Sequence, residues 1–368
     1  MDVTRLANPG ARSVGTYVPG KSIKEVQAEL GLEHLIKLAS NENPFGPAPA
    51  AARGFAGLAE RIHIYPDSRS RVVRAALAER LGVSAEQITT GNGSDGVIYN
   101  LGMAVIDQDD EVIIPRITFP IYETITRVMR GKAVRSRMKD LRIDLEDIRR
   151  RVNRRTKLIF LCNPNNPTGD ALPPEHLASF LSSIPERVLI ALDEAYVDFT
   201  EPASRLDSID LFNRGMDNLF ILRTFSKVYG LAGVRFGFAV GDRELVSLID
   251  RVKPPFDVSL AAEEAALHAL ADRDFYLRTL VSCGEEKSYF YSELDALGLG
   301  YIPSHTNFVL IDTGRDAGAV VQALLRRGVI VRSAVQYSLP KHIRVTVGRH
   351  EENERFFRAF AEALEETA

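Results

Sequence analysis

The stretch VLIALDEAY, residues 188–196, joins a run of apolar residues to two carboxylates and a tyrosine. A second stretch of the same kind, LFILRTFSK, covers residues 219–227 and ends on a lysine. Each begins with a mostly apolar run, as expected for a strand that is covered on both faces of a sheet. Each becomes polar where the strand ends. Because ligands of open α/β sheets bind beyond the carboxyl ends of the strands, the two stretches predict both a fold and the position of its site.

Similar apolar runs surround these two stretches. We expect strands at Gln87–Thr90, Glu111–Ile114, Leu158–Cys162, Val188–Leu192, Leu219–Thr224 and Phe236–Val240. Helical patterns separate them; in Ser70–Leu81, apolar residues recur at helical spacing, Ser70 offers an N-cap and Gly82 a stop. Strands that alternate with helices predict an α/β fold, with a mostly parallel mixed sheet sandwiched by helices.

The pattern changes near residues 254–255, which are both proline. We expect a long helical region from about Ser259 to Leu297, punctuated by Gly284, and then elements at Asn307–Asp312, Ala317–Arg327, Val329–Arg332, His342–Val347 and from Glu351 onward. This pattern predicts a smaller α+β domain. A chain of 368 residues is also longer than the chains that usually fold around a single hydrophobic core. We therefore predict an N-terminal segment over residues 1–40 that packs with the small domain, a large domain over residues 41–255 and a small C-terminal domain over residues 256–368.

Charge and cysteine content exclude several classes of protein. The 46 basic and 49 acidic residues leave a net charge of −3, so we expect neither nucleic acid nor an acidic membrane as a partner. Cys162 and Cys283 allow one disulfide at most and lie in no metal-ligand spacing, so no metal site is expected. No apolar segment reaches the length of a membrane span, and the N-terminus leads into no secretion signal. A soluble protein of the reducing cytoplasm is the expectation.

Four predicted strands are followed at once by polar or glycine-rich segments, at residues 91–96, 163–169, 193–196 and 225–227. The first, GNGSDG, matches the G-x-G-x-x-G pattern of dinucleotide sites, but Glu111 begins its strand where the pattern needs an acidic residue at the end. A nicotinamide-dependent oxidoreductase is therefore kept only as an alternative. The segment also misses the nucleophile elbow of hydrolases at its first position. A glycine-rich turn that opens a helix suits a phosphate; a plain helix capped by Ser94 or Asp95 is the other interpretation.

Lys227 and Asp193 lie at the ends of neighbouring predicted strands. A lysine at the carboxyl edge of a sheet is a candidate nucleophile towards a carbonyl, although alone a solvated surface lysine is the commoner case. Asp193, at the end of an apolar strand, is costly to bury without a cationic partner, which a protonated ring nitrogen would provide. Arg235 follows eight residues after Lys227, close enough to share an anion with Ser226. For Asp193 the alternative role is an N-cap, and for Tyr196 a packing aromatic.

Seven short motifs occur in order along nearly the whole chain. They are LASNENP (residues 38–44), YPD (65–67), GNGSD (91–95), NPTG (166–169), DEAY (193–196), Ser226-Lys227 with Arg235, and IRVTVG (343–348). Together they closely resemble the fold-type I, pyridoxal-phosphate-dependent aminotransferases of class I and II. Within that family, residues 17–21 (YVPGK) and 351–355 (EENER) are most similar to the histidinol-phosphate aminotransferase branch.

The resemblance implies pyridoxal 5′-phosphate as the cofactor and assigns roles to single residues. Lys227 would hold it as a Schiff base and then move a proton between the substrate and the cofactor. Asp193 would pair with the pyridine nitrogen, so that the ring accepts electrons. Asn166 and Tyr196 would bind the phenolic oxygen, and Phe119 would stack on the ring unless it only packs in the core. The phosphate would be held by Gly93, Ser94, Asp95, Thr224, Ser226 and Arg235.

The resemblance also implies the substrates and a partner subunit. Arg344 would bind the carboxylate of the substrate or the phosphate of histidinol phosphate, and Arg332 would be a second phosphate ligand, unless it forms a structural ion pair. Tyr17 and Asn43 would line the substrate pocket. Tyr65 would reach the cofactor phosphate of the neighbouring subunit, which makes a homodimer obligatory.

The expected reaction is ping-pong transamination between histidinol phosphate and 2-oxoglutarate, in histidine biosynthesis. An aromatic amino acid is the alternative amino donor. A decarboxylase, oxidase or lyase on the same fold shares Lys227 and Asp193, so the motifs do not separate it. Gly96, Asp257 and Lys287 depart from the residues common in the family, and they leave the substrate less certain than the cofactor.

Overall fold

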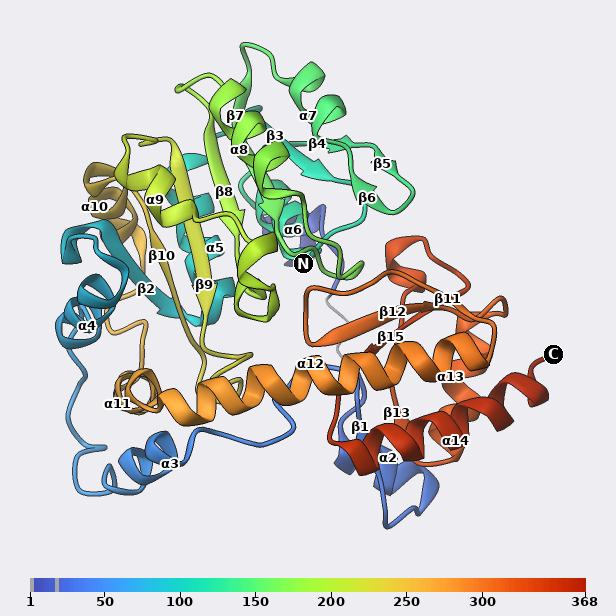
Figure 1. Cartoon of the computed structure of the whole chain (residues 1–368). Helices are drawn as coiled ribbons and strands as arrows, with labels where there is room; N and C mark the ends of the chain where they lie inside the picture. Colours follow the sequence, from blue (N-terminus) through green and yellow to red (C-terminus); the bar gives the residue numbers. More distant parts are fainter. Residues whose placement is uncertain (1–2, 17–19) are drawn as a thin grey trace.

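The computed structural model describes residues 3–16 and 20–368, which form two main sheets of different size, two further two-stranded sheets and the helices around them (Figure 1). The larger sheet contains, in spatial order, β2 (Ile88–Asn92), β10 (Phe236–Val240), β9 (Leu219–Thr224), β8 (Leu189–Asp193), β7 (Thr156–Cys162), β3 (Glu111–Pro115) and β4 (Lys132–Ser136). β10 runs opposite to the other six strands, which all run in the same direction. The predicted mostly parallel mixed sheet is therefore confirmed.

Apolar clusters cover both faces of the larger sheet. Alternate residues of β7 face opposite ways: Phe160 belongs to a cluster with α5 and α6, whereas Ile159 belongs to a cluster with α8. The helices around this sheet are α3 (Pro49–Ala56), α4 (Arg71–Leu81), α5 (Gly93–Val105), α6 (Ile121–Val128), α7 (Leu145–Arg151), α8 (Pro174–Ser183), α9 (Ser208–Asn213), α10 (Arg243–Val252) and α11 (Leu260–Ala271). Burial on both faces explains why the strands are apolar throughout instead of alternating.

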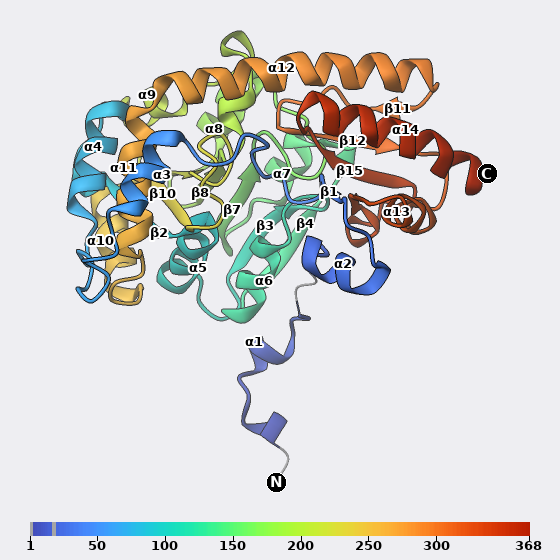
Figure 2. The same cartoon turned by 90° about the horizontal axis from the view of Figure 1, so that it is seen from below.

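The smaller sheet has the order β11 (Gly300–Tyr301), β12 (Phe308–Asp312), β15 (His342–Thr346) and β14 (Arg332–Ser333). It packs with α13 (Ala317–Arg326) and α14 (His350–Glu366), and α12 (Arg273–Ala296) runs from the larger layer to the smaller one (Figure 2). The expected strand at 329–332 is in fact two strands. Its first half, β13 (Val329–Ile330), leaves the sheet to pair in parallel with β1 (Ile36–Lys37), and β14 follows.

Two details of the helical predictions are corrected by the structure. The region 259–297 breaks at Asp272 and not at Gly284, because the Asp272 side chain accepts a hydrogen bond from the backbone N–H of Phe275 and so caps α12. Ser70 precedes α4 but has a φ of 48° and makes no side-chain cap. Gly82 ends α4 with a φ of 68°, as predicted.

The N-terminal residues divide between the two layers. The pairing of β1 with β13 places residues 36–37 beside the smaller sheet, close to α2 (Ile23–Leu30). By contrast, α1 (Pro9–Arg12) contacts α6, and the chain beyond it extends away from the body through η1 (Val3–Leu6) (Figure 2). Because α11 packs on α3 and α4 of the large layer, we propose that the two domains meet along α12.

The remaining short elements are the hairpin β5 (Met138–Lys139) and β6 (Arg142–Ile143) and the 3₁₀ turns η2 (Ala85–Gln87), η3 (Val197–Phe199), η4 (Pro202–Ser204) and η5 (Val335–Tyr337). Cys162 and Cys283 are both buried and free. None of the helices in the described part of the chain has the length and apolar character needed to cross a bilayer.

Candidate active site

A pocket of about 340 Å³ opens where the carboxyl ends of the large sheet meet the smaller sheet. It brings together most of the residues singled out in the sequence: Ser94, Asp95, Phe119, Asn166, Asp193, Tyr196, Thr224, Ser226, Lys227, Arg235, Arg332 and Arg344. The strands β7, β8 and β9 each deliver part of this set from the segment that follows the strand. The predicted position of the site is thus where the structure places it.

Lys227 lies in the turn after β9, with its amine in this pocket. The amine is 3.5 Å from the carbonyl oxygen of Ser40 and 5.5 Å from the ring centre of Tyr196. Although the residue is not wholly covered, desolvation of the amine and the nearby Arg344 lower its pKa to about 8. A lysine in this state has a sizeable neutral fraction near neutral pH, as a nucleophile towards a carbonyl requires.

Asp193 is the last residue of β8 and is almost fully buried. Burial raises the pKa of this carboxyl to about 6, and hydrogen bonds from Tyr122 and from the backbone N–H of Ala195 oppose the rise. The two donors lie 2.6 Å from Oδ2 and 3.0 Å from Oδ1, respectively. The bond from the N–H of Ala195 to Asp193 is of the kind expected if Asp193 served as an N-cap, its alternative role. The carboxylate nevertheless lines the pocket as well. A buried carboxylate with no basic side chain bonded to it is suited to a cationic ligand group.

The turn between β2 and α5 forms an anion cradle. Asn92 precedes α5 and makes no side-chain cap, and Ser94 and Asp95 lie inside the helix, contrary to the plain-cap interpretation. The N–H of Gly93 donates to the carbonyl oxygen of Arg235 at 2.9 Å, so the backbone N–H groups of Ser94 and Asp95 are the ones suited to an anion. Gly93 has a φ of 72°, and a Cβ at this position would lie 2.3 Å from Nη2 of Arg235. Arg235 in turn approaches Asp95 at 3.4 Å. A helix N-terminus, an arginine and the hydroxyl-bearing Thr224 and Ser226 together suit a phosphate.

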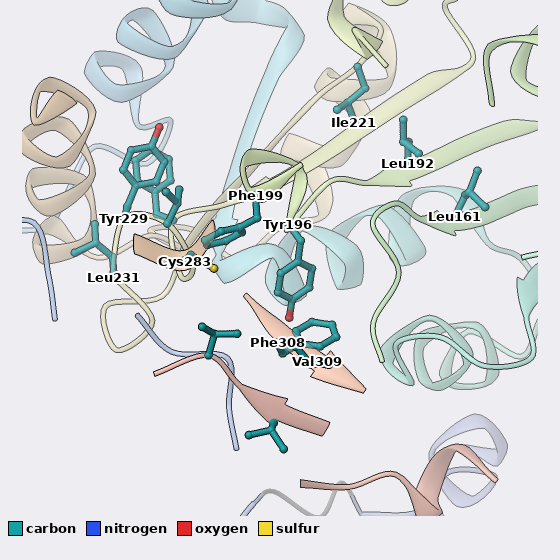
Figure 3. Packing of buried hydrophobic residues seen from close by; sticks show 14 of the residues in the cluster. Leu161, Leu192, Tyr196, Phe199, Ile221, Tyr229, Leu231, Cys283, Phe308 and Val309 are labelled. Atoms are coloured by element: carbon teal, nitrogen blue, oxygen red, sulfur yellow. The ribbon is translucent and has the colours of Figure 1, made fainter. Parts of the chain in front are cut away.

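Two groups are oriented to donate hydrogen bonds into the pocket. Arg344 Nη1 donates to Oδ1 of Asn166 at 2.7 Å, which leaves the amide N–H₂ of Asn166 to donate. The hydroxyl of Tyr196 accepts from Asn41 Nδ2 at 2.8 Å, so its own hydrogen remains available. Figure 3 shows Tyr196 between the two layers, with its ring edge-on to Phe308 of the smaller sheet at 5.2 Å. This contact fixes the ring and directs the hydroxyl.

Arg344 and Arg332 come from the paired strands β15 and β14. Arg344 is buried, and besides Asn166 it donates from Nη2 to the carbonyl oxygen of Ala39 at 2.8 Å. Its Nε is buried without a hydrogen-bond partner in the described structure, which is the state of a group that awaits an anionic ligand. Arg332 donates from Nη2 to Oε1 of Gln336 at 2.8 Å.

Two of the residues assigned from the sequence lie outside this pocket. Asn43 does not line the pocket; its amide donates to the carbonyl oxygen of Val228 at 2.9 Å. Tyr65 is 79% exposed and stacks on Phe256 at 4.5 Å, outside the pocket of its own chain. Tyr17 falls outside the described residues. Gly96, Asp257 and Lys287, which depart from the family pattern, also lie away from the pocket.

The structure adds lining residues that sequence reasoning missed, above all Asn41 and Tyr122. Asn41 is two positions from Asn43 in the same motif, and its φ of 55° turns its side chain towards Tyr196 and Thr346. The motif was visible, but it did not distinguish the two asparagines. Tyr122 follows Phe119 by three residues, in the first turn of α6, and this closeness in sequence was the available signal.

The residues present fit pyridoxal phosphate. The fit rests on the unpartnered Nε of Arg344, the cradle at Gly93 and Arg235, and the buried carboxylate of Asp193 near a lysine with a lowered pKa. These provide one site each for a substrate anion, a phosphate, a ring nitrogen and a carbonyl group.

Comparison with known proteins agrees with this geometry. Residues 33–360 match the model of the family "Aminotransferase class I and II". A histidinol-phosphate aminotransferase of Moorella thermoacetica is 42% identical over 96% of this chain and 91% of its own, and one from Nitrosococcus oceani is 41% identical over 98% of both chains. The crystal structure of histidinol-phosphate aminotransferase from Sinorhizobium meliloti in complex with pyridoxal-5′-phosphate has a TM-score of 0.89 at 28% identity and covers 98% of both chains.

Proposed function

The chain belongs to the class I and II aminotransferases, and from this premise we propose that it is a histidinol-phosphate aminotransferase. It is a transaminase that uses pyridoxal phosphate. The family assignment decides against the nicotinamide-dependent and hydrolase interpretations of residues 91–96. The observation that carries the proposal is a single pocket that holds Lys227, Asp193 and two arginines from adjacent strands.

When bound, pyridoxal phosphate supplies a carbonyl group that takes up an amino group and a ring that accepts electrons from the substrate carbon. Lys227 attaches the cofactor through its amine. As a free base, the amine of Lys227 would take the proton from Cα of the bound substrate and release it to C4′ of the cofactor. The lowered pKa of about 8 suits both directions, since the amine has to accept and release a proton near neutral pH.

Three further residues hold and tune the ring. Asp193, as a carboxylate, keeps the ring nitrogen protonated and so strengthens the electron-accepting character of the ring. Asn166 and Tyr196 donate hydrogen bonds to the phenolic oxygen, and their other partners, Arg344 and Asn41, already occupy their accepting atoms. These donors are therefore oriented before any ligand binds, and this preorganisation avoids a cost during the reaction.

The two arginines favour a phosphate-bearing amino donor. A dianionic phosphate gains from two guanidinium groups, whereas one forked arginine suffices for a carboxylate. In the second half of the reaction, Arg344 would bind a carboxylate of 2-oxoglutarate. The curated relatives at about 40% identity carry the histidinol-phosphate name over nearly the full chain, and this supports histidinol phosphate over an aromatic amino acid.

A half-reaction experiment tests this function. Holoenzyme mixed with histidinol phosphate alone should lose the visible absorption of its bound cofactor, and 2-oxoglutarate should restore it. With an amino acid as the donor, a decarboxylase would release carbon dioxide, and with either donor an oxidase would consume oxygen. Neither of them would show the reversal. A colourless protein that is unaffected by added pyridoxal phosphate would refute the cofactor itself.

Borohydride reduction identifies the attachment point. Peptide mapping of the reduced holoenzyme should find the cofactor on Lys227. Lys287 is a suitable control, because burial also lowers its pKa but it donates to the carbonyl oxygen of Ser304, outside the pocket. Lys227→Arg should abolish both the labelling and the reaction, whereas Lys287→Arg should retain both.

We further propose a homodimer in which Tyr65 completes the site of the neighbouring subunit. The support is the exposed ring of Tyr65, which stacks on Phe256, together with the exposed side chains of Ile62 and Ile64 nearby in the sequence. Most of the Tyr65 ring is open to solvent in the single chain, so it is accessible to a second copy. A second copy of the chain would cover this surface.

Mixed dimers test the shared site. Tyr65→Ala and Lys227→Ala proteins, each of low activity, are unfolded together and refolded at equal amounts. In a mixed dimer one of the two sites then has both native residues, so about a quarter of wild-type activity should return. If each site is built from one chain only, no activity returns.

The cytoplasm is the proposed location. Two buried cysteines without a disulfide fit a reducing compartment. Fractionation of cells that express a tagged protein would test this proposal, and recovery with a membrane or secreted fraction would contradict it.

A further inference from the structure

Tyr122 connects two parts of the candidate site. It lies in the first turn of α6, its side chain is fully buried, and its hydroxyl is 2.6 Å from Oδ2 of Asp193. The same ring stacks on Phe160 at 4.7 Å and meets Phe119 edge-on at 5.8 Å. One side chain therefore contacts both the carboxylate meant for the ring nitrogen and the aromatic residue meant to cover the ring.

The hydrogen bond has a defined direction. A carboxylate can only accept, so the phenol donates, and a neutral donor stabilises the charged form of Asp193 over its protonated form. Burial and the nearby Asp193 raise the pKa of Tyr122 well above its ordinary value, so the phenol keeps its proton at any working pH. Tyr122 is thus a permanent donor to Asp193.

The hydrogen bond from Tyr122 opposes the free-energy cost of keeping Asp193 ionised in a buried position. Burial alone disfavours the ionised form of Asp193, and Asp95 and Glu194 add repulsion. Apart from Tyr122, the backbone N–H of Ala195 is the other donor that opposes burial. Loss of the phenol hydroxyl therefore removes one of two groups that favour the charge on which the ring nitrogen depends.

We infer that Tyr122 is a positioning residue, whose hydroxyl keeps Asp193 ionised and in place for the ring nitrogen of the cofactor. This inference rests on the proposed use of pyridoxal phosphate. It adds to the site a residue that does not touch the reacting atoms and acts through Asp193. Its ring contacts with Phe160 and Phe119 are the structural part of its role, and the hydroxyl is the electrostatic part.

Tyr122→Phe separates the two parts, since it keeps the ring and removes only the oxygen. The dissociation constant for pyridoxal phosphate is measured from pH 5 to 9 by titration of the cofactor-free protein. Removal of a donor to a carboxylate raises the pKa of that carboxylate, so the acid limb of the affinity profile should move to higher pH by about one unit. Near pH 6.5 the affinity should fall about tenfold.

Tyr276→Phe is the matched control. The hydroxyl of Tyr276, on α12, donates to Oδ1 of Asp198 at 2.7 Å, so the same substitution breaks the same kind of pair outside the pocket. This variant should keep the wild-type pH profile. Equal profiles for Tyr122→Phe and wild type, or equal shifts in both variants, would overturn the inference.

A second pair of variants makes the test independent of simple destabilisation. In an Asp193→Asn background no charge is left to stabilise, so Tyr122→Phe should change cofactor affinity less than threefold and shift no pH limb. Site-specific replacement of Tyr122 by a fluorotyrosine, a stronger donor of nearly the same shape, should move the acid limb of the otherwise wild-type protein to lower pH. If Tyr122→Phe does not fold, the fluorotyrosine protein alone tests the inference. An acid limb at the same pH as in wild type would then contradict it. Failure of wild type to bind pyridoxal phosphate at any pH would instead refute the proposed function.

Discussion

Arg344 and Asn166 are 178 positions apart and join the two sheets through one hydrogen bond of 2.7 Å, from Nη1 to Oδ1. Arg344 belongs to the smaller sheet, and Asn166 follows a strand of the larger one. We propose that this arginine binds the substrate and that this amide binds the cofactor. A change at either residue therefore reaches both ligands.

Arg344→Lys should damage turnover of every substrate. Lysine keeps the charge but lacks the planar fork that bonds Asn166, Ala39 and a bidentate anion together. We expect kcat/KM for glutamate to fall about 100-fold, which corresponds to the loss of a charge-assisted pair. Arg358→Lys, at an exposed position of α14, is the control and should stay within twofold of wild type in the same steady-state assay. A loss below fivefold for Arg344→Lys would remove this residue from the binding site.

Arg332→Ala should discriminate between amino donors. It removes the second guanidinium, which a dianionic phosphate needs and a carboxylate does not. We expect kcat/KM for histidinol phosphate to fall about tenfold further than that for phenylalanine. Half-reaction rates with the two donors measure this difference. Equal losses would mean that Arg332 has no role in phosphate binding and would favour an aromatic amino acid as the substrate.

Gly93→Ala should weaken cofactor binding through Arg235. An alanine Cβ would lie 2.3 Å from Nη2 of Arg235 and would displace its guanidinium from the cradle. We expect the dissociation constant for pyridoxal phosphate to rise about tenfold.

Gly215→Ala provides the control for Gly93→Ala. Gly215 has a φ of 98°, so alanine is strained there as well, but nothing lies within 4 Å of the added Cβ. Both variants should lose about 1 kcal/mol or more of unfolding free energy, and only Gly93→Ala should lose cofactor affinity. Similar affinity in both would show that strain, and not the cradle, governs the result.

Asp193→Asn should stabilise the cofactor-free protein at neutral pH. Folding raises the pKa of Asp193 from 3.8 to about 6, so the ionised side chain costs about 3 kcal/mol of folded stability above pH 6. For a raised pKa the stability is present at low pH and is lost as the pH rises through 6. The gain from Asn should therefore be largest near pH 7.5 and largely gone near pH 4. Urea unfolding of the cofactor-free proteins at both pH values measures it, and a gain of the same size at pH 4 would contradict the charge argument.

Much of the large layer could be predicted from the sequence, because continuous apolar runs report strands that are covered on both faces. The segments after β7, β8 and β9 could also be predicted as a site, since polar residues directly after such strands lie at the carboxyl edge of the sheet, where ligands bind. Edge strand β4 (KAVRS) was missed because it is largely polar and only partly buried. The pattern of apolar residues in the sequence does not indicate a strand that is polar and only partly buried.

The partners of the site residues could not be predicted in the same way. The bond between Tyr122 and Asp193 spans 71 positions, and the bond between Asn41 and Tyr196 spans 155. Such pairs depend on how the layers pack, and one sequence does not record this packing. The break at Asp272 was missed for a smaller reason: an aspartate cap ends one helix and begins the next without a glycine or proline to mark it.

The long helix α12 has a consequence for how the molecule unfolds. Its 24 residues give a rod of about 36 Å, and residues along it belong to one apolar cluster that also contains strands of both sheets. Two layers that share a rod and a continuous interior do not melt separately. A calorimetric scan should therefore show one cooperative transition, and damage far out in the smaller layer should lower the melting temperature of the cofactor pocket by the same amount.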